Sequence, residues 1–337
     1  MAKTQKGRPR IAVIGAGNLS CNFHLPSQQH LTKIGRSTLA AICDVNPEAA
    51  AKAAKEFGIP AVYSDADAML RAEKPDGVIV IVPVKFTARV ASRVMLAGFP
   101  VLLEKPPGAS ARDCRQLIAA AKKSRQPNVV AFNRRHCPVI VQGRAEILKR
   151  GNIKGASGLM YRHNRDDDDF FFGTGIHSLD ALRYIGGDID FVELDHRTVG
   201  KGERPVYTLI IGYKNGGVGA LEIRPQSGAH LERYEIFGPE SIAFVNAGVG
   251  WLLDAPGTCT LFEKNQPIKL PDPLLEMKKV QKNKKLAAAI SGGFFGENEA
   301  FVNALSGKGK FAPSVEESLQ SVEIAEAVQA GKSWKRK

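Results

Sequence analysis

The stretch IAVIGAGNLS, residues 11–20, decides the fold of this 337-residue chain. Its first four residues form a continuous apolar run, which is typical of a strand buried on both faces of a parallel sheet. Gly15 and Gly17 follow at once, and a helical pattern then covers about residues 18–34. A strand, a glycine turn and a helix in this order open a doubly wound α/β domain.

The glycine turn is close to the G-x-G-x-x-G/A pattern that receives the pyrophosphate of a dinucleotide at a helix N-terminus. Gly15 would make the tight turn, Gly17 would let the backbone approach the pyrophosphate, and Ser20 is small enough for the third position. The alternative is a glycine turn in a domain that binds no ligand. The cofactor-binding residues predicted in this turn are Gly15, Ala16, Gly17, Asn18 and Leu19.

Asp44 follows the second predicted strand, residues 39–43. A carboxylate at this place is expected to hydrogen-bond the ribose hydroxyl groups of a dinucleotide. It would repel the 2′-phosphate of NADP, and the next two residues, Val45 and Asn46, offer no cation. The sequence therefore favours NAD over NADP as the cofactor.

Strands and helices alternate from residue 10 to about residue 135. This alternation is the order of a parallel sheet with helices between its strands. We therefore predict a Rossmann domain that binds NAD(P) over residues 10–135. Beyond the first unit, the predicted strands are 39–43, 61–63, 77–82, 101–103 and 129–132, and the predicted helices are 48–57, 66–72, 85–97 and 111–124.

From about residue 136, strand-like segments with turn sequences dominate. Lys214-Asn215-Gly216-Gly217 lies between two such segments, 207–213 and 218–224, and predicts a hairpin. A second hairpin is predicted over residues 234–246. Earlier in this half, helices are predicted over 139–149 and 178–184, with a strand near 156–163 between them.

The chain ends in a predicted helix that begins with a capping box, Ser314 and Glu317. Taken together, residues 136–332 are predicted to form an α+β domain with a predominantly antiparallel sheet. We expect this domain to bind the substrate and to serve oligomerisation, and we expect its terminal helix to pack back on the first domain.

The net charge of +13 lies in three segments: the first ten residues, the last six, and residues 278–285. Together they carry 13 basic residues and no acidic one. A nucleic-acid-binding protein would carry this charge along a binding motif, and the sequence has none that we find. Residues 1–9 are therefore predicted to be a disordered basic arm and residues 333–337 a solvated basic tail. Weak attraction to polyanions is the alternative.

Composition also bears on the compartment. The apolar run 77–84 is too short to span a bilayer, and no apolar signal segment follows the basic N-terminus. The five cysteines are odd in number and irregularly spaced, which indicates reduced thiols. We expect a cytoplasmic protein with no membrane partner and no nucleic-acid partner.

Four motifs resemble those of the glucose–fructose oxidoreductase and inositol dehydrogenase family (Gfo/Idh/MocA). The resemblance covers residues 10–332. Its most specific part is Glu-Lys-Pro at the end of the fifth strand. The motifs are His24-Leu25-Pro26 after the glycine turn, Glu104-Lys105-Pro106, Asn133-Arg134-Arg135, and the segment from Thr174 through His177 to Asp180.

The resemblance implies a nicotinamide-dependent oxidoreductase that transfers hydride between NAD(H) and a sugar, a polyol or a related hydroxy or carbonyl compound. Lys105 would lie near the nicotinamide and hydrogen-bond the reacting oxygen, and His177 would be the general acid/base. A homo-oligomer is implied as well. The resemblance adds Pro83, Glu104 and Lys105 to the predicted cofactor contacts. Arg162 and His163 end a predicted strand just before the His177 segment, so they are candidate substrate contacts, with sheet-surface residues as the alternative. Asp180, one helical turn after His177, is a further candidate substrate contact, with a structural role as the alternative.

Two positions depart from the family pattern. Gly173 stands four residues before His177, where many members carry Asp, and Thr87 stands where many carry His. Two alternatives to a dehydrogenase stay open. One is an NAD-retaining glycosidase of the same family, and the other, motivated by Gly173, is a non-enzymatic dinucleotide-binding sensor or scaffold.

Several polar residues have structural interpretations. Arg134 and Arg135 are expected to form structural ion pairs, and His24 is expected to cap or pack near the first helix. The aspartates 166–169 predict a solvated loop, because consecutive residues rarely converge on one ion. No metal site is predicted.

Overall fold

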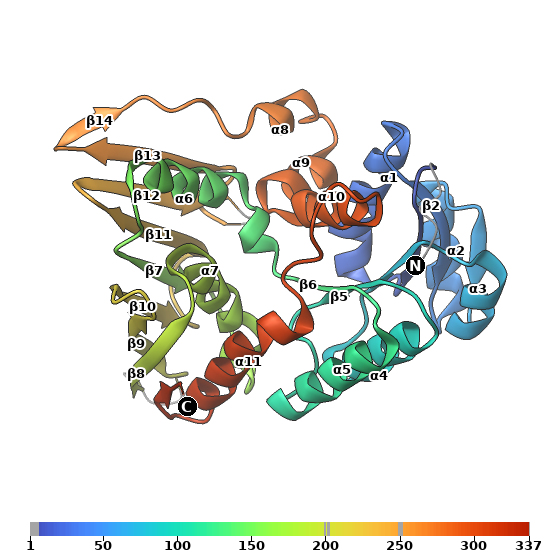
Figure 1. The fold of residues 1–337 in the computed structure, drawn as a ribbon, viewed down its shortest axis with the longest axis horizontal. Coiled ribbons are helices and arrows are strands. Elements are labelled where there is room, and N and C mark those ends of the chain that lie inside the picture. Colours follow the sequence, from blue (N-terminus) through green and yellow to red (C-terminus); the bar gives the residue numbers. More distant parts are fainter. Residues whose placement is uncertain (1–6, 199, 201–202, 249–251, 337) are drawn as a thin grey trace. The chain divides into compact units, whose positions relative to one another are not determined.

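The computed structural model of the chain describes residues 7–198, 200, 203–248 and 252–336. The chain consists of two compact units (Figure 1). Unit 1 comprises residues 1–131, 283–289 and 294–319, and unit 2 comprises residues 132–282, 290–293 and 320–337. The six residues at the start of the predicted basic arm lie outside the described residues.

Unit 1 is built on a six-stranded sheet with the order β3-β2-β1-β4-β5-β6, in which all paired strands are parallel. This is the strand order of dinucleotide-binding Rossmann domains, so the predicted fold class is confirmed. From β1, the chain adds β2 and β3 on one side and then β4, β5 and β6 on the other side. The boundary between β1 and β4 is the topological switch point, where ligands of such folds bind. The strands are β1 Arg10–Ile14, β2 Thr38–Cys43, β3 Ala61–Tyr63, β4 Gly77–Val80, β5 Val101–Glu104 and β6 Asn128–Ala131.

Capping residues mark the ends of several helices between these strands, as in α2. In α2, Asn46 caps the first turn by accepting from the Glu48 and Ala49 backbone N–H groups, and Gly58 ends the helix at a φ of 71°. The helical segments are η1 Ser20–His24, a π-helix, α1 Leu25–Lys33, α2 Pro47–Phe57, α3 Ala66–Glu73, α4 Val84–Leu96 and α5 Ala111–Ser124.

A later helix completes the core of unit 1. Phe301 and Val302 of α10, Phe294–Leu305, are buried in the same apolar cluster as Ile11 of β1. A Cβ atom on Gly77 would lie 2.6 Å from the Leu305 side chain and 2.9 Å from the Phe301 ring, so a larger residue would force these α10 side chains to shift. The sequence assigned residues 136–332 to the second domain and did not predict this return.

Unit 2 contains a nine-stranded sheet with the order β14-β13-β12-β11-β7-β10-β9-β8-β15. Its strand pairs are antiparallel except for β7 with β10, which confirms the predicted sheet type. Both predicted hairpins form, β9 with β10 and β11 with β12. The strands are β7 Gly155–Tyr161, β8 Ile189–Arg197, β9 Val206–Tyr213, β10 Val218–Arg224, β11 Leu231–Gly238, β12 Ser241–Ala247, β13 Gly257–Glu263, β14 Gln266–Ile268 and β15 Trp334–Lys335.

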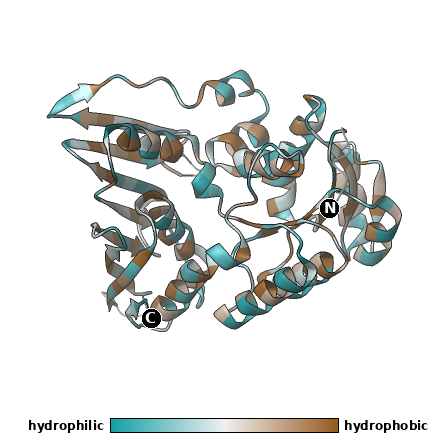
Figure 2. Ribbon diagram, viewed as in Figure 1, coloured by the Kyte–Doolittle hydropathy of each residue, from teal (hydrophilic) through white to brown (hydrophobic). Residues whose placement is uncertain are grey.

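Helices cover part of this sheet: α6 packs on β11, β12 and β13, and α7 packs on β7 and β11. Hydrophilic and hydrophobic residues both occur along the strands (Figure 2), as expected where one face is buried and the other meets solvent. The remaining helical segments are η2 Asn133–His136, α6 Pro138–Arg150, η3 Phe171–Gly175, α7 Ile176–Gly186, α8 Leu275–Lys279, α9 Lys284–Ser291 and α11 Val315–Gln329. None of the described helices is both long and apolar enough to cross a membrane.

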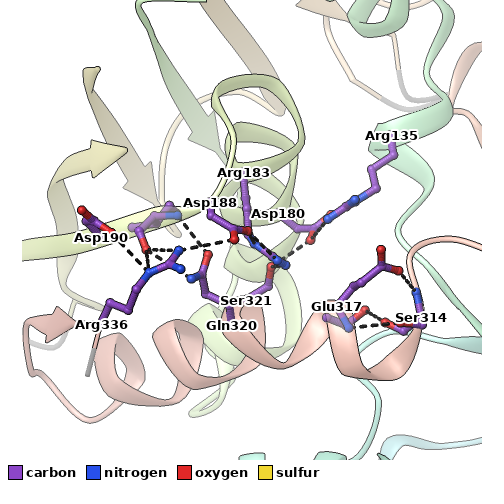
Figure 3. A network of polar contacts seen from close by, with 12 residues as sticks. Arg135, Asp180, Arg183, Asp188, Asp190, Ser314, Glu317, Gln320, Ser321 and Arg336 are labelled. Carbon is purple, nitrogen blue, oxygen red and sulfur yellow. Dashed lines mark hydrogen bonds and ion pairs between the residues drawn. The ribbon is translucent and has the colours of Figure 1, made fainter. Parts of the chain in front are cut away.

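The last segment of the chain comprises α11, which begins with the predicted capping box, and the tail of residues 333–337. The capping box is confirmed: the Ser314 N–H donates to Glu317 Oε2 at 2.6 Å, and the Glu317 N–H donates to Ser314 Oγ at 3.1 Å (Figure 3). The C-terminal tail keeps exposed side chains at Ser333 and Lys335, but it also pairs with the sheet, which the sequence did not predict. β15 pairs with β8, and Arg336 Nε lies 3.2 Å from Asp190 Oδ1. The edge of the sheet and its carboxylates provide these partners, and they cannot be predicted from the neighbouring residues in the sequence.

Candidate dinucleotide site

The glycine turn has the backbone that its sequence predicts. Gly15 has a φ of 110°, and a Cβ atom there would lie 1.9 Å from the Ile81 carbonyl oxygen. Only glycine fits both constraints. The position of a Cβ on Gly17 meets open space, so a ligand can approach the backbone at this point. Ser20, at the third position, is fully buried.

Asp44 holds the turn in place from the end of β2. One carboxylate oxygen, Oδ2, accepts from the Ala16 N–H at 2.7 Å, and the other, Oδ1, accepts from the Asn46 N–H at 2.8 Å. Each carboxylate oxygen has a second lone pair. The partly exposed carboxylate can therefore also accept a hydrogen bond from a ligand hydroxyl group.

A cavity of about 690 Å³ opens over the carboxyl ends of β1, β2 and β4. This volume lies within the range of small-molecule and cofactor sites. Four of the predicted cofactor contacts line it, namely Gly15, Gly17, Asp44 and Pro83, whereas Ala16, Asn18 and Leu19 are not among its described lining residues. Glu104 and Lys105 lie elsewhere in unit 1.

The sequence did not predict the far wall of this cavity. That wall comes from the start of α3 and from α4, and its residues include Asp65, Asp67, Phe86, Arg89 and Arg93. Sequence position could have indicated Asp65 and Asp67, since residues just after the carboxyl end of a strand face the ligand edge of such a sheet, whereas Arg89 and Arg93 lie too far along α4 for this signal. Arg93 forms an ion pair with Asp67, and the Arg89 guanidinium lies 5.3 Å from the centre of the Phe86 ring.

Glu104 and Lys105 lie at the end of β5. The Glu104 side chain is buried; its Oε1 lies 2.8 Å from His24 Nε2, and its Oε2 accepts from the Lys105 N–H at 3.0 Å. Glu104 therefore anchors the start of the loop of residues 105–110, which follows β5 and is called the Lys105 loop below. His24 packs as expected near the first helix, and its ring is fully buried.

In unit 2, the predicted acid/base residue His177 is the second residue of α7 and is half-buried. The π-helix η3 precedes α7 and contains Gly173. A Cβ atom on Gly173 would lie 3.8 Å from Asp169 Oδ2, which is ordinary van der Waals contact. A carboxylate is thus present beside the position where many family members carry Asp.

Asp180 does not face a ligand site. Its carboxylate is fully buried, accepts two hydrogen bonds from Arg135 at 2.7 and 2.9 Å, and accepts a third from Ser321 Oγ at 2.8 Å (Figure 3). A buried charge needs such partners, so this carboxylate is committed to structure. These contacts favour the structural alternative for Asp180 over a substrate contact, and they confirm the ion pair expected for Arg135.

Arg162 is likewise internal. It is buried together with Arg134 around Glu232, and Arg134 binds that carboxylate at 2.6 and 2.9 Å. Burial raises the pKa of Glu232, but the charges of Arg134 and Arg162 outweigh it and lower the pKa to about 2. Arg162 is therefore neither a substrate contact nor a sheet-surface residue. His163, in contrast, is exposed, and its Nδ1 lies 3.0 Å from the Ser227 carbonyl oxygen.

The acidic run 166–169 is largely exposed, as predicted for a solvated loop, but two of its aspartates have ion-pair partners. Asp167 is held by Arg165 at 2.7 Å, and this hydrogen-bonded ion pair lowers the pKa of the Asp167 carboxyl. Asp168 forms an ion pair with Arg204 at 2.8 Å, an arginine 36 positions further along the chain. The sequence could not predict the pairing with Arg204, because that arginine comes from another segment of the chain.

Comparison with known proteins agrees with this architecture. Residues 9–132 match the oxidoreductase family with an NAD-binding Rossmann fold, and residues 161–336 match the C-terminal alpha/beta domain of that family. Fold and sequence together define an NAD-binding oxidoreductase. More specifically, the chain belongs to the Gfo/Idh/MocA oxidoreductase family.

Among curated relatives, D-glucoside 3-dehydrogenase of Escherichia coli K12 is 28% identical over 53% of this chain and 54% of its own length. D-apiose dehydrogenase of Paraburkholderia graminis is 28% identical over 72% of this chain and 66% of its own length. The matched segments thus span between about half and two thirds of these relatives. Inositol 2-dehydrogenase 2 of Saccharopolyspora erythraea is 29% identical over 52% of this chain and 53% of its own length.

Solved structures share the fold. Levoglucosan dehydrogenase in complex with NADH and L-sorbose has a TM-score of 0.80 at 19% identity, covering 98% of this chain and 99% of that chain. UDP-N-acetylglucosamine 3-dehydrogenase from Acidithiobacillus ferrooxidans has a TM-score of 0.75 at 21% identity, covering 96% and 98%. At these identities the likeness concerns the fold alone.

Proposed function

We propose that the chain is an NAD-dependent dehydrogenase or reductase that acts on a CH–OH group of a sugar, a polyol or a related compound. The observation that carries the proposal is the placement of Asp44, whose carboxylate is bonded to the glycine turn and lines the same cavity as Gly15 and Gly17. The named activities of the curated relatives, which act on a glucoside, apiose and inositol, support the substrate class.

The residues present fit a dinucleotide. Backbone N–H groups after Gly17 would face the pyrophosphate at the start of the helix, where the helix dipole favours negative charge. Asp44 would accept hydrogen bonds from the adenosine ribose and would repel a 2′-phosphate. Arg89 and Arg93 line the same cavity, but Arg93 is paired with Asp67, so NAD is the proposed cofactor.

Bound NAD(H) supplies the hydride acceptor or donor, and the protein must position the reacting carbon and move one proton. We assign the proton to His177, because an imidazole titrates near neutral pH. The Lys105 ammonium group would stabilise an oxygen that develops negative charge during the reaction. These two roles come from the family resemblance.

Asp169 is our candidate for the carboxylate that Gly173 does not supply. The Gly173 N–H donates to the Asp169 carbonyl at 2.7 Å, so the two residues lie one turn apart on the same face. The three preceding aspartates are bonded to Gln226, Arg165 and Arg204, whereas the Asp169 side chain has no hydrogen-bond partner among the described residues. Its carboxylate is therefore available to orient a proton donor or a substrate hydroxyl.

The first test is calorimetry with NAD⁺, NADH, NADP⁺ and NADPH, followed by a panel of sugars and polyols monitored at the absorbance of reduced nicotinamide. Turnover of any panel member with NAD⁺ supports the proposal. Cofactor binding without turnover across the panel would favour the sensor. Release of a sugar leaving group without net cofactor reduction would favour the glycosidase.

The role of Asp169 has its own test. Asp169→Asn is expected to lower kcat at least ~10-fold, and adding Gly173→Asp to that variant is expected to restore part of the rate, because a carboxylate returns to the same place. Asp166→Asn is the matched control, since it removes the same charge from the same run. Full activity in Asp169→Asn would exclude a catalytic part for this carboxylate.

A further inference from the structure

A row of buried polar side chains runs through unit 1, apart from the cavity described above. Ser37 Oγ donates to Gln28 Oε1 at 3.4 Å, and Gln28 Nε2 donates to Asn298 Oδ1 at 2.9 Å. Asn298 Nδ2 lies 3.0 Å from His24 Nδ1, and His24 Nε2 lies 2.8 Å from Glu104 Oε1. All five residues are buried; three of them lie within residues 24–37, whereas Glu104 and Asn298 come from distant segments. A buried polar row of this kind specifies one arrangement when every member is satisfied.

The row fixes the tautomer of His24. Asn298 Nδ2 also donates to the Phe294 carbonyl oxygen, at 2.8 Å, and this oxygen can only accept. Turning the Asn298 amide over would set its Oδ1 against the Phe294 oxygen, so the amide nitrogen must point toward His24. His24 Nδ1 therefore accepts a hydrogen bond, and the ring proton lies on Nε2, from which it is donated to Glu104.

The row ends at Glu104, next to Lys105, the residue to which we assign charge stabilisation. Glu104 accepts from His24 with one oxygen and from the Lys105 backbone N–H with the other, at 3.0 Å. His24 is also the last residue of the π-helix Ser20–His24, which directly follows the glycine turn. Single π-helical turns of this kind occur frequently at functional sites. One short segment thus carries both the cofactor turn and the support of the Lys105 loop.

We propose that His24, held by Asn298 as the Nε2–H tautomer, is a positioning residue that fixes the Glu104 carboxylate and through it the start of the Lys105 loop. The inference rests on the proposed function only in the role given to Lys105. Catalytic groups must be held by a supporting shell, and misplacement by about 1 Å can cost ~10²-fold in rate.

A metal site is the competing interpretation of the same residues. Ligand atoms of His24, Glu104 and Glu297 all lie within 4.8 Å of one another, and His24 Nε2 lies 3.9 Å from Glu297 Oε1. A metal ion would need the lone pair of Nε2, which the proton occupies in this tautomer. A metal ion bound in stoichiometric amount, and lost on replacing His24, would overturn the proposal.

The kinetic test compares His24→Gln with His24→Leu in the full chain. The glutamine amide can reproduce both hydrogen bonds of this tautomer, since its oxygen can accept from Asn298 and its nitrogen can donate to Glu104. We expect His24→Leu to lower kcat at least ~10-fold with NAD⁺ affinity within about twofold, and His24→Gln to restore most of kcat. His30→Leu, in the adjoining helix, is the matched control. Unchanged kcat in His24→Leu would overturn the proposal.

Two further measurements do not depend on turnover. In nitrogen-15 spectra of histidine-labelled wild-type protein at neutral pH, the signal absent from His24→Gln must show the Nε2–H tautomer; the Nδ1–H tautomer or a doubly protonated ring would overturn the proposal. Hydrogen exchange of the Lys105 amide must accelerate in His24→Leu and stay slow in His24→Gln, and equal rates in both would also overturn it. If the wild-type protein turned over no sugar or polyol while both results held, only the proposed function would fail.

Discussion

Replacing Asp44 by Asn tests the cofactor site most directly. The carboxylate accepts from two backbone N–H groups, those of Ala16 at 2.7 Å and Asn46 at 2.8 Å, and it lines the cavity. An amide keeps one oxygen acceptor but sets an NH₂ group against the other N–H donor. The turn therefore loses one charge-assisted hydrogen bond and gains a repulsive contact.

The magnitude follows from these contacts. A hydrogen bond to a charged group contributes about 1.5–3 kcal/mol, and the amide would also weaken acceptance from the ribose hydroxyl groups. Because every 1.4 kcal/mol changes affinity about tenfold, we expect the Kd for NAD⁺ to rise about 10- to 100-fold. The loss of negative charge should at the same time lower the ratio of the NADP⁺ Kd to the NAD⁺ Kd at least ~10-fold.

Isothermal titration calorimetry of wild-type and Asp44→Asn protein with both oxidised cofactors measures these changes. Asp76→Asn is the matched control, because Asp76 carries the same charge in unit 1, accepts from the Arg10 N–H and does not line the cavity. If Asp44→Asn bound NAD⁺ within about twofold of wild type and kept its cofactor preference, our account of the dinucleotide site would be refuted.

Three more outcomes are expected. Gly15→Ala should lower the free energy of unfolding by at least ~2 kcal/mol in a urea titration, because the new methyl group meets the Ile81 carbonyl and L residues avoid this φ; a loss below ~0.5 kcal/mol would contradict the turn geometry. The pKa of Glu232 is lowered from 4.5 to about 2 on folding, so its contribution to stability is present above about pH 4.5 and is lost as the pH falls toward 2. Glu232→Gln should therefore flatten the pH dependence of unfolding in this window, and an unchanged slope would argue against the buried ion pair. Lys105→Ala and His177→Ala should each lower turnover at least ~10²-fold in steady-state assays, and full rates in both would remove the assigned roles.

The sequence alone determined the elements that depend on neighbouring residues. The strand and glycine turn at residues 11–20, the capping box of Ser314 and Glu317, and the hairpin around Asn215 are encoded by apolar periodicity, by the backbone freedom of glycine and by side chains that bond nearby N–H groups. The position of Asp44 at a strand end followed from the same reasoning, since the end of β2 always meets the turn after β1 in a parallel sheet of this order.

Only the tertiary structure decided which polar side chains have buried partners. Arg162 ends a strand and Asp180 sits one helical turn beyond His177, so both could have faced a ligand. Their real partners, Glu232 and Arg135, are 70 and 45 positions away. His24 and Asn298 are separated by 274 positions and meet only because α10 returns to unit 1. Such contacts arise from how segments pack in three dimensions, and burial then forces each charge or amide to find a partner that local sequence does not reveal.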